Sequence, residues 1–279
     1  MTIRTLEKII TANPTSDGDG VKISRSLGSH NLPQLDPFLL LDELGSDDAA
    51  DYMGGFPPHP HRGFETVTYM LEGQMRHKDS AGNEGVISAG GIQWMTAGSG
   101  IIHSEMPEQN EGMLWGFQLW INLPAAQKMR APRYQEIESK NIPELSGDFG
   151  TVRVMAGEAD GTAGAVTEIA TQPTLLDVRL NASGEKSITL PTEHTALLYV
   201  YKGHLSVGDK KLSTKQLGQL SSGEAVTITA GDEGTGALLL AAAPLNEPIA
   251  RMGPFVMNTE AELQTAYSDY RRGELVQAS

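Results

Sequence analysis

A strand-and-turn pattern occurs twice in this chain of 279 residues. The segment Tyr69–Met75 reads Tyr-Met-Leu-Glu-Gly-Gln-Met, and the segment Tyr199–Leu205 reads Tyr-Val-Tyr-Lys-Gly-His-Leu. In each segment apolar and aromatic residues lead into a glycine, as in a β-strand that ends at a tight turn. The repetition predicts one β unit used twice, and hence two similar domains. The alternative is two unrelated hairpins that both turn at glycine.

A second pair of similar segments supports the repetition. These segments end at Gly98 and Gly231, which follow the turn glycines Gly73 and Gly203 by 25 and 28 positions. Between and beyond them, short runs of β-branched and aromatic residues alternate with Gly, Pro, Asn and Asp, a pattern that predicts an all-β sandwich or barrel. The runs are Thr66–Leu71, Leu114–Leu123, Thr151–Met155, Leu175–Leu180, Leu197–Tyr201, Ala225–Thr229 and Ala237–Ala241.

One short helix is predicted near the C-terminus. Thr259 can cap its start, and Glu262 stands three residues later, where a capping box requires Glu or Gln. Leu263, Ala266 and Tyr267 then recur at helical spacing.

Charge and composition exclude several classes of function. The formal net charge is −14 and no run of Lys or Arg occurs, so direct binding to nucleic acid or to an anionic membrane is not expected. The chain has no Cys, which excludes disulfides and thiolate ligands. Residues 1–13 lack the apolar core of a signal peptide, and no apolar run approaches the ~20 residues of a membrane span. We therefore expect a cytoplasmic protein.

Two short motifs have the spacing of metal ligands. His59 and His61 lie two residues apart, as do His103 and Glu105. In a strand, residues two apart point to the same face, so each pair can aim at one point. If the two strands are neighbours in a barrel, three imidazoles and one carboxylate converge, a set that suits Fe(II), Mn, Co, Ni, Cu or Zn. The alternative is a pair of exposed loops that carry histidine.

The remaining candidates are less specific. Glu65 follows His61 by four residues, and it can be a ligand, a group that orients an imidazole, or an ordinary strand residue. The other histidines are interpreted as surface or structural side chains: His30, His77, His194 and His204. When the offsets of the repetition are applied to the four candidate ligands, they fall on residues that are not metal ligands: Thr189, Pro191, Gly236 and Leu238.

The segments Pro57–Tyr69 and Gln93–Glu105 resemble, in order and separation, the two metal motifs of the pirin family of the cupin superfamily. Flanking segments agree with the family: Asp36–Glu43, Gly116–Pro124, Arg251–Asn258 and Asp269–Gly273. The resemblance implies a bicupin, with two antiparallel β-barrel (jelly-roll) domains and the short C-terminal helix. Residues 1–140 would form the metal-binding domain, and residues 141–279 a second cupin without metal ligands.

The resemblance also implies a ligand set. The pirin pattern transfers to His59, His61, His103 and Glu105, with one metal ion that is Fe(II) by expectation. In other cupins the carboxylate ligand comes from the first motif, which would be Glu65 here. We follow the pirin pattern and keep Glu65 as a second carboxylate that can act in catalysis beside Glu105.

Three functions follow from the resemblance. The first is a quercetin 2,3-dioxygenase-like enzyme, which opens a flavonol ring with O2, and Glu105 or Glu65 would take the hydroxyl proton. Phe56, Trp94 and Met95 would then line the cavity, or they belong to the ordinary core of the barrel. The second is a non-catalytic, metal- or redox-sensitive regulator that binds a protein partner. The third is a cupin isomerase or sugar-binding protein without redox chemistry. A monomer is the expectation of the family.

Overall fold

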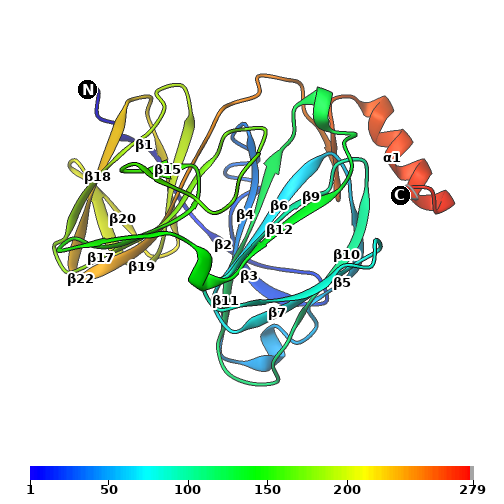
Figure 1. Ribbon diagram of the computed structural model, residues 1–279, viewed down its shortest axis with the longest axis horizontal. Helices are drawn as coiled ribbons and strands as arrows, with labels where there is room; N and C mark the ends of the chain where they lie inside the picture. The colour runs from blue at the N-terminus through cyan, green and yellow to red at the C-terminus, as the bar shows by residue number, and fades with distance from the viewer. Residues whose placement is uncertain (277–279) are drawn as a thin grey trace. The chain divides into compact units, whose positions relative to one another are not determined.

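The computed structural model describes residues 1–276, which form two compact units (Figure 1). Unit 1 consists of residues 1–13, 29–37 and 140–244. Unit 2 consists of residues 14–28 and 38–139, together with the chain from residue 245 onward. The division expected from the sequence, 1–140 and 141–279, agrees with these units near residue 140 and differs in both terminal segments. The reason is strand pairing: the first strand of the chain pairs within unit 1, and the last segment packs on unit 2.

Unit 1 contains a sheet of antiparallel strands in the order β1-β21-β19-β22-β17-β14-β13, with β18 added to β22 and β20 added to β19, and a separate two-stranded sheet of β15 and β16. Its strands are β1 (Leu6–Thr11), β13 (Glu144–Gly147), β14 (Gly150–Ala156), β15 (Glu158–Ala159), β16 (Thr162–Ala163), β17 (Thr174–Leu180), β18 (Glu185–Thr189), β19 (Thr195–Val207), β20 (Lys210–Ser213), β21 (Gln216–Leu220) and β22 (Ala225–Ala242). The two runs expected at 225–229 and 237–241 are one long strand, because β22 pairs first with β18 and then with β17. Buried aliphatic side chains fill its interior.

Unit 2 contains two antiparallel sheets, in the orders β12-β9-β6-β11-β4-β3-β2 and β5-β10-β7-β8. Figure 1 shows β6, β9 and β12 in one layer and β5, β7 and β10 in the other. The strands are β2 (Asn13–Asp17), β3 (Val21–Leu27), β4 (Phe38–Ser46), β5 (Phe56–His61), β6 (Phe64–Glu72), β7 (Gln74–Asp79), β8 (Glu84–Ser88), β9 (Ile92–Thr96), β10 (Ile101–Pro107), β11 (Leu114–Asn122) and β12 (Arg133–Ile137). Short 3-10 turns are Ala49–Asp51, Ala125–Gln127 and Ser139–Asn141.

The C-terminal segment of unit 2 adds a hairpin and a helix: β23 (Ala250–Met252), β24 (Phe255–Met257) and α1 (Glu260–Arg272). The predicted helix is confirmed, with its capping box formed by Thr259 and Glu262. Leu263 and Ala266 bury the apolar face of the helix, as their spacing predicts. The all-β fold of two antiparallel units with a short C-terminal helix is therefore confirmed. No helix in the described chain is long and apolar enough to span a membrane.

A buried lysine ties the C-terminal segment to the barrel of unit 2. The Lys128 ammonium is 1% exposed and donates to the Asn122 side-chain oxygen (2.6 Å) and to the carbonyls of Gly63 (2.8 Å) and Val256 (3.0 Å). Burial lowers the pKa of Lys128 to about 8, so at pH 7 the ammonium is still mostly protonated and can donate three hydrogen bonds.

Replacing Lys128 by methionine is expected to lower the free energy of unfolding by about 3 kcal/mol, because three buried acceptors lose their donor. Urea denaturation followed by circular dichroism measures the change. Lys211→Met is the matched control, since Lys211 is exposed on β20 and forms no ion pair with a described residue. Equal midpoints for the two variants would contradict a stabilising role of Lys128.

Candidate metal centre

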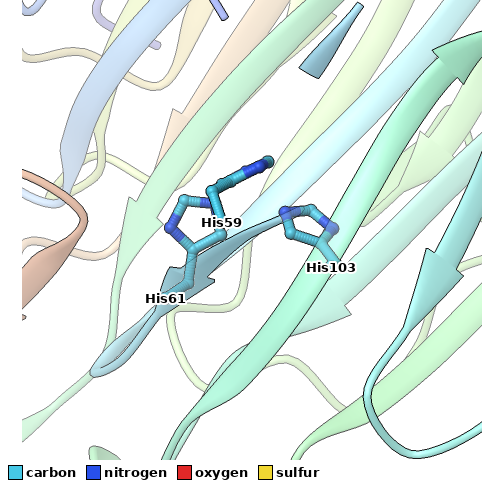
Figure 2. Close-up of side chains that lie close together, drawn as sticks. All are labelled: His59, His61 and His103. Carbon is cyan, nitrogen blue, oxygen red and sulfur yellow. The ribbon is translucent and has the colours of Figure 1, made fainter. Parts of the chain in front are cut away.

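Three histidines converge inside unit 2. His59 and His61 lie on β5 and His103 lies on β10, and the two strands pair with His103 opposite His59. One ligand nitrogen from each ring lies within 4.8 Å of the other two. The ring centroids are 4.4–4.9 Å apart, and Figure 2 shows the three rings gathered at one point from two neighbouring strands. The period-two spacing of His59 and His61 agrees with their position on one face of β5.

The outer nitrogen, Nδ1, of each ring is engaged away from the cluster. These contacts are His59 Nδ1 to the Pro57 carbonyl (2.8 Å), His61 Nδ1 to the Pro254 carbonyl (3.4 Å) and His103 Nδ1 to His77 Nδ1 (3.4 Å). This leaves Nε2 as the ligand atom, and Nε2 of His103 is buried without a hydrogen-bond partner among the described residues. Imidazoles that bind metals commonly donate their other N–H in this way.

The charge state of the rings also fits a metal. Burial is the main cause that lowers the pKa of His61 and of His103 well below the ordinary value. Both rings are therefore neutral at pH 7, which is the form that coordinates a metal ion. A buried Nε2 without a partner costs free energy unless something binds it. The residues present thus fit a borderline divalent ion held by three nitrogens.

Glu105 lies beside the three rings and outside their group. It follows His103 by two residues on β10 and lines the same cavity as His59 and His61. Its carboxylate is buried and accepts hydrogen bonds from Thr68 Oγ1 (2.7 Å) and from Gln118 Nε2 (2.9 Å). The Glu105 carboxylate therefore lines the cavity, and its two hydrogen bonds fix its position.

Glu65 lies on the other face of β6. Side chains alternate along a strand, and Thr68, which contacts Glu105, points to the site, so Glu65 points away from it. Glu65 accepts a hydrogen bond from Thr96 Oγ1 (2.6 Å), and burial raises the pKa of its carboxyl group. Its placement does not support the hypothesis that Glu65 acts in catalysis at this site. Trp94 on β9 lies opposite Val67, and Val67 is on the same face of β6 as Glu65. The Trp94 side chain therefore also points away from the site.

His77 was interpreted from the sequence as a surface or structural side chain, and the structure shows that it is buried beside the cluster. The residue is 1% exposed, lies opposite Glu105 on β7, and contacts His103 with ring centroids 5.3 Å apart. The charged neighbours Arg76 and Lys78 suggested a polar hairpin. The signal that was missed is the alternation along β7, in which every second residue is buried.

His77 is placed to orient His103. Burial lowers the pKa of His77, so its ring is neutral at pH 7 and its Nδ1 can accept a hydrogen bond from Nδ1–H of His103. If Nε2 of His103 binds a metal, Nδ1 of His103 carries the proton and donates it to His77. His77→Leu is therefore expected to weaken metal binding about 10–100-fold, and His77→Gln, which restores an acceptor, to weaken it less.

A competition titration against a chelator measures these affinities, with His30→Leu as the control for loss of an exposed imidazole. If the Leu and Gln variants bind the metal equally well, the contact with His77 does not anchor His103.

A cavity of about 550 Å³ opens beside the imidazoles. Its wall is apolar at Ile23, Leu40, Leu44, Phe56 and Trp120, as expected for Phe56. Met95 instead packs with Ala97 and Ile101. Two arginines and three carboxylates are also in the wall: Arg25, Arg251, Asp17, Asp42 and Glu105. Ligand sites in proteins commonly measure 300–1,000 Å³ and combine an apolar wall with a few polar groups.

In unit 1, apolar residues occupy the strand positions that correspond to His59 and His103 of unit 2. In unit 2, His103 on β10 pairs with His59 on β5; in unit 1, Val226 on β22 pairs with Ile188 on β18. Ile188 and Val226 belong to the aliphatic core of unit 1. The offsets between the two repeated segments predicted different positions for these residues. The reason is that Gly98 follows the short strand β9, whereas Gly231 lies inside β22.

Two family models match successive parts of the chain. The family model described as Pirin matches residues 20–121, and the model described as Pirin C-terminal cupin domain matches residues 175–276. A protein named "putative quercetin 2,3-dioxygenase" from Vibrio cholerae is 46% identical over 275 residues, 97% of each chain. A pirin-like protein from Caulobacter vibrioides is 48% identical and covers 98% of this chain and 99% of its own.

A solved structure shows the same architecture. The crystal structure of quercetin 2,3-dioxygenase from Acinetobacter baumannii has a TM-score of 0.90 to this chain at 36% identity, over 98% of both chains. Two matched domain models and relatives of nearly equal length lead to one assignment. The chain is a protein of two cupin-type domains and belongs to the pirin family.

Proposed function

We propose that this chain is a metal-dependent dioxygenase of the quercetin 2,3-dioxygenase type, which opens the ring of a flavonol with O2. The observation that carries the proposal is the convergence of three imidazoles, two of which, His59 and His61, line a cavity of about 550 Å³ together with the Glu105 carboxylate. The names of the relatives from Vibrio cholerae and Acinetobacter baumannii support the same reaction class.

His59, His61 and His103 are proposed to hold one divalent ion through Nε2, with Glu105 as the carboxylate that completes the set. Fe(II) is the proposed metal, and Mn, Co, Ni, Cu and Zn suit the same donors. A metal ion bound there would act as a Lewis acid and lower the pKa of a hydroxyl group that coordinates it. The chain supplies the rigid frame, because two paired strands fix the rings and each Nδ1 is bonded elsewhere.

Glu105 is proposed to accept the hydroxyl proton of the substrate. Thr68 and Gln118 hold the carboxylate on the inner face, where it lines the cavity. A general base must lie within hydrogen-bond reach of the proton that it takes, and a fixed position beside the metal ligands provides this.

The apolar wall is proposed to bind the flavonol rings. Trp120 and Phe56 offer aromatic surfaces, and Trp120 lies against His61 with ring centroids 5.2 Å apart. A planar aromatic ligand that chelates the metal can therefore contact Trp120 and Phe56. The surrounding aliphatic side chains would exclude water from the reacting ring.

Metal content and oxygen uptake on one purified sample test the proposal. Apoprotein is loaded in separate samples with Fe(II), Mn, Co, Ni, Cu and Zn, and quercetin is added in an oxygen electrode. We expect about one metal per chain and oxygen uptake that depends on the metal and the flavonol, with ring-opened product. One bound metal without oxygen uptake on any flavonol would overturn the enzymatic function and leave the metal-sensitive regulator as the leading hypothesis.

A further inference from the structure

Two arginines line the cavity, and their surroundings differ. Arg25 is paired with carboxylates: Nε and Nη2 donate to the two Asp42 oxygens (2.8 and 2.6 Å), and Nη2 also donates to Asp17 (2.7 Å). These contacts hold the pKa of Arg25 above its ordinary value. Arg25 therefore serves as a fixed part of the wall.

Arg251 is not paired with carboxylates in this way. It lies on β23, in the C-terminal segment that packs on the barrel of unit 2, and it is half-buried. One Nη1–H donates to the Leu39 carbonyl (2.9 Å), and the guanidinium carbon lies 4.9 Å from the centre of the Trp120 ring. Within the described chain Arg251 forms no ion pair, so the rest of its planar donor fork is available to a ligand.

The position of Arg251 relates it to the metal centre. Trp120 contacts both the His61 ring (5.2 Å between centroids) and the Arg251 guanidinium (4.9 Å from the ring centre). All three residues line one cavity. A ligand of drug size that reaches the imidazoles and contacts Trp120 therefore also reaches Arg251.

We propose that Arg251 determines substrate specificity by binding an ionised acidic oxygen, such as a carboxylate, at the end of the substrate that lies away from the metal ligands. This inference rests on the proposed function and narrows its substrate class to aromatic chelators that carry a second, anionic group. The guanidinium matches a carboxylate with two parallel hydrogen bonds, and such charged hydrogen bonds are stronger than neutral ones. Partial burial strengthens the attraction, since less water screens the two charges.

Anaerobic binding to the metal-loaded protein tests the inference without any turnover. The probes are 3-hydroxyflavone and its 4′-carboxylate, which differ in one anionic group. The carboxylate is expected to bind about 10–100-fold more tightly to the wild-type protein, the range of a charged hydrogen bond. In Arg251→Met this ratio is expected to fall to about one, and in Arg251→Lys to an intermediate value, because an ammonium keeps the charge and loses the planar fork. Arg271→Met, an exposed site on α1, controls for net charge and should keep the wild-type ratio.

Equal affinities of the two probes for the wild-type protein, or a ratio that persists in Arg251→Met, would overturn the inference and leave the dioxygenase proposal intact. If neither flavonol binds, the proposed function fails instead. Benzoate and benzamide carry no chelating group and differ in charge. Their affinities, measured by quenching of tryptophan fluorescence, then test the inference. Preference for benzoate that Arg251→Met removes would support it, and equal binding of both would overturn it.

Discussion

Replacement of His103 by alanine is expected to lower the affinity for a divalent metal by at least about 100-fold and to abolish oxygen uptake with a flavonol. His103 contributes one of the three converging nitrogens, and its Nε2 has no other partner among the described residues. Two imidazoles on β5 then remain, which leave an incomplete set for a borderline divalent ion. Loss of the metal removes the chemistry that the other residues position.

Metal analysis after dialysis and an oxygen electrode measure the two losses. A third readout separates metal loss from misfolding: a ligand at 100 times its Kd stabilises a folded protein by about 2.7 kcal/mol, so added metal should raise the Tm of the wild-type protein and not that of the variant. His30→Ala, which removes an exposed imidazole, is the matched control. A His103→Ala protein that retains one tightly held metal and full turnover would show that the three-histidine cluster is not the metal centre.

Local patterns predicted the features that depend on local geometry. His59 with His61, and His103 with Glu105, reach one face because side chains alternate along a strand. The capping box and the spacing of Leu263 and Ala266 likewise describe a single helix and needed no tertiary information. These features belong to one element each, so the sequence contains them directly.

Features that depend on pairing between distant segments were missed. His77 reaches the site because β7 pairs with β10, and Arg251 reaches it because β23 returns to unit 2 from the end of the chain. The same return explains why the expected division at residue 140 assigned the terminal segments differently from the structure. No periodicity within either segment reports which strand or barrel it will join.

The ambiguity between Glu65 and Glu105 has a specific cause. Glu65 follows His61 by four residues, and continuous alternation would place both on one face. Gly63 lies between them with φ of +89°, in the left-handed region, and an added Cβ would meet the Val256 carbonyl at 2.0 Å. The chain turns there from β5 to β6, so the alternation of one strand does not continue into the next.

Glu105→Gln is expected to lower turnover by at least about 100-fold while the protein still binds one metal per chain at saturating metal. The amide keeps the size of the side chain and can retain the contact with Thr68 or Gln118, but it cannot accept a proton at neutral pH. The three imidazoles converge without Glu105, which is why the metal should remain. Loss of the negative charge should lower metal affinity by no more than about 100-fold.

The two proposed roles of Glu105 give different results in this variant. If Glu105 acts only as a ligand, turnover recovers when excess metal restores occupancy; if it also accepts the proton, turnover stays low at full occupancy. Thr68→Val provides the matched comparison, because it keeps the carboxylate and removes one of its two hydrogen bonds. We expect Thr68→Val to bind the metal normally and to lose less turnover than Glu105→Gln. Wild-type turnover in metal-saturated Glu105→Gln would assign proton transfer to another group, and Glu65 could not take this role directly because it lies on the opposite face of β6.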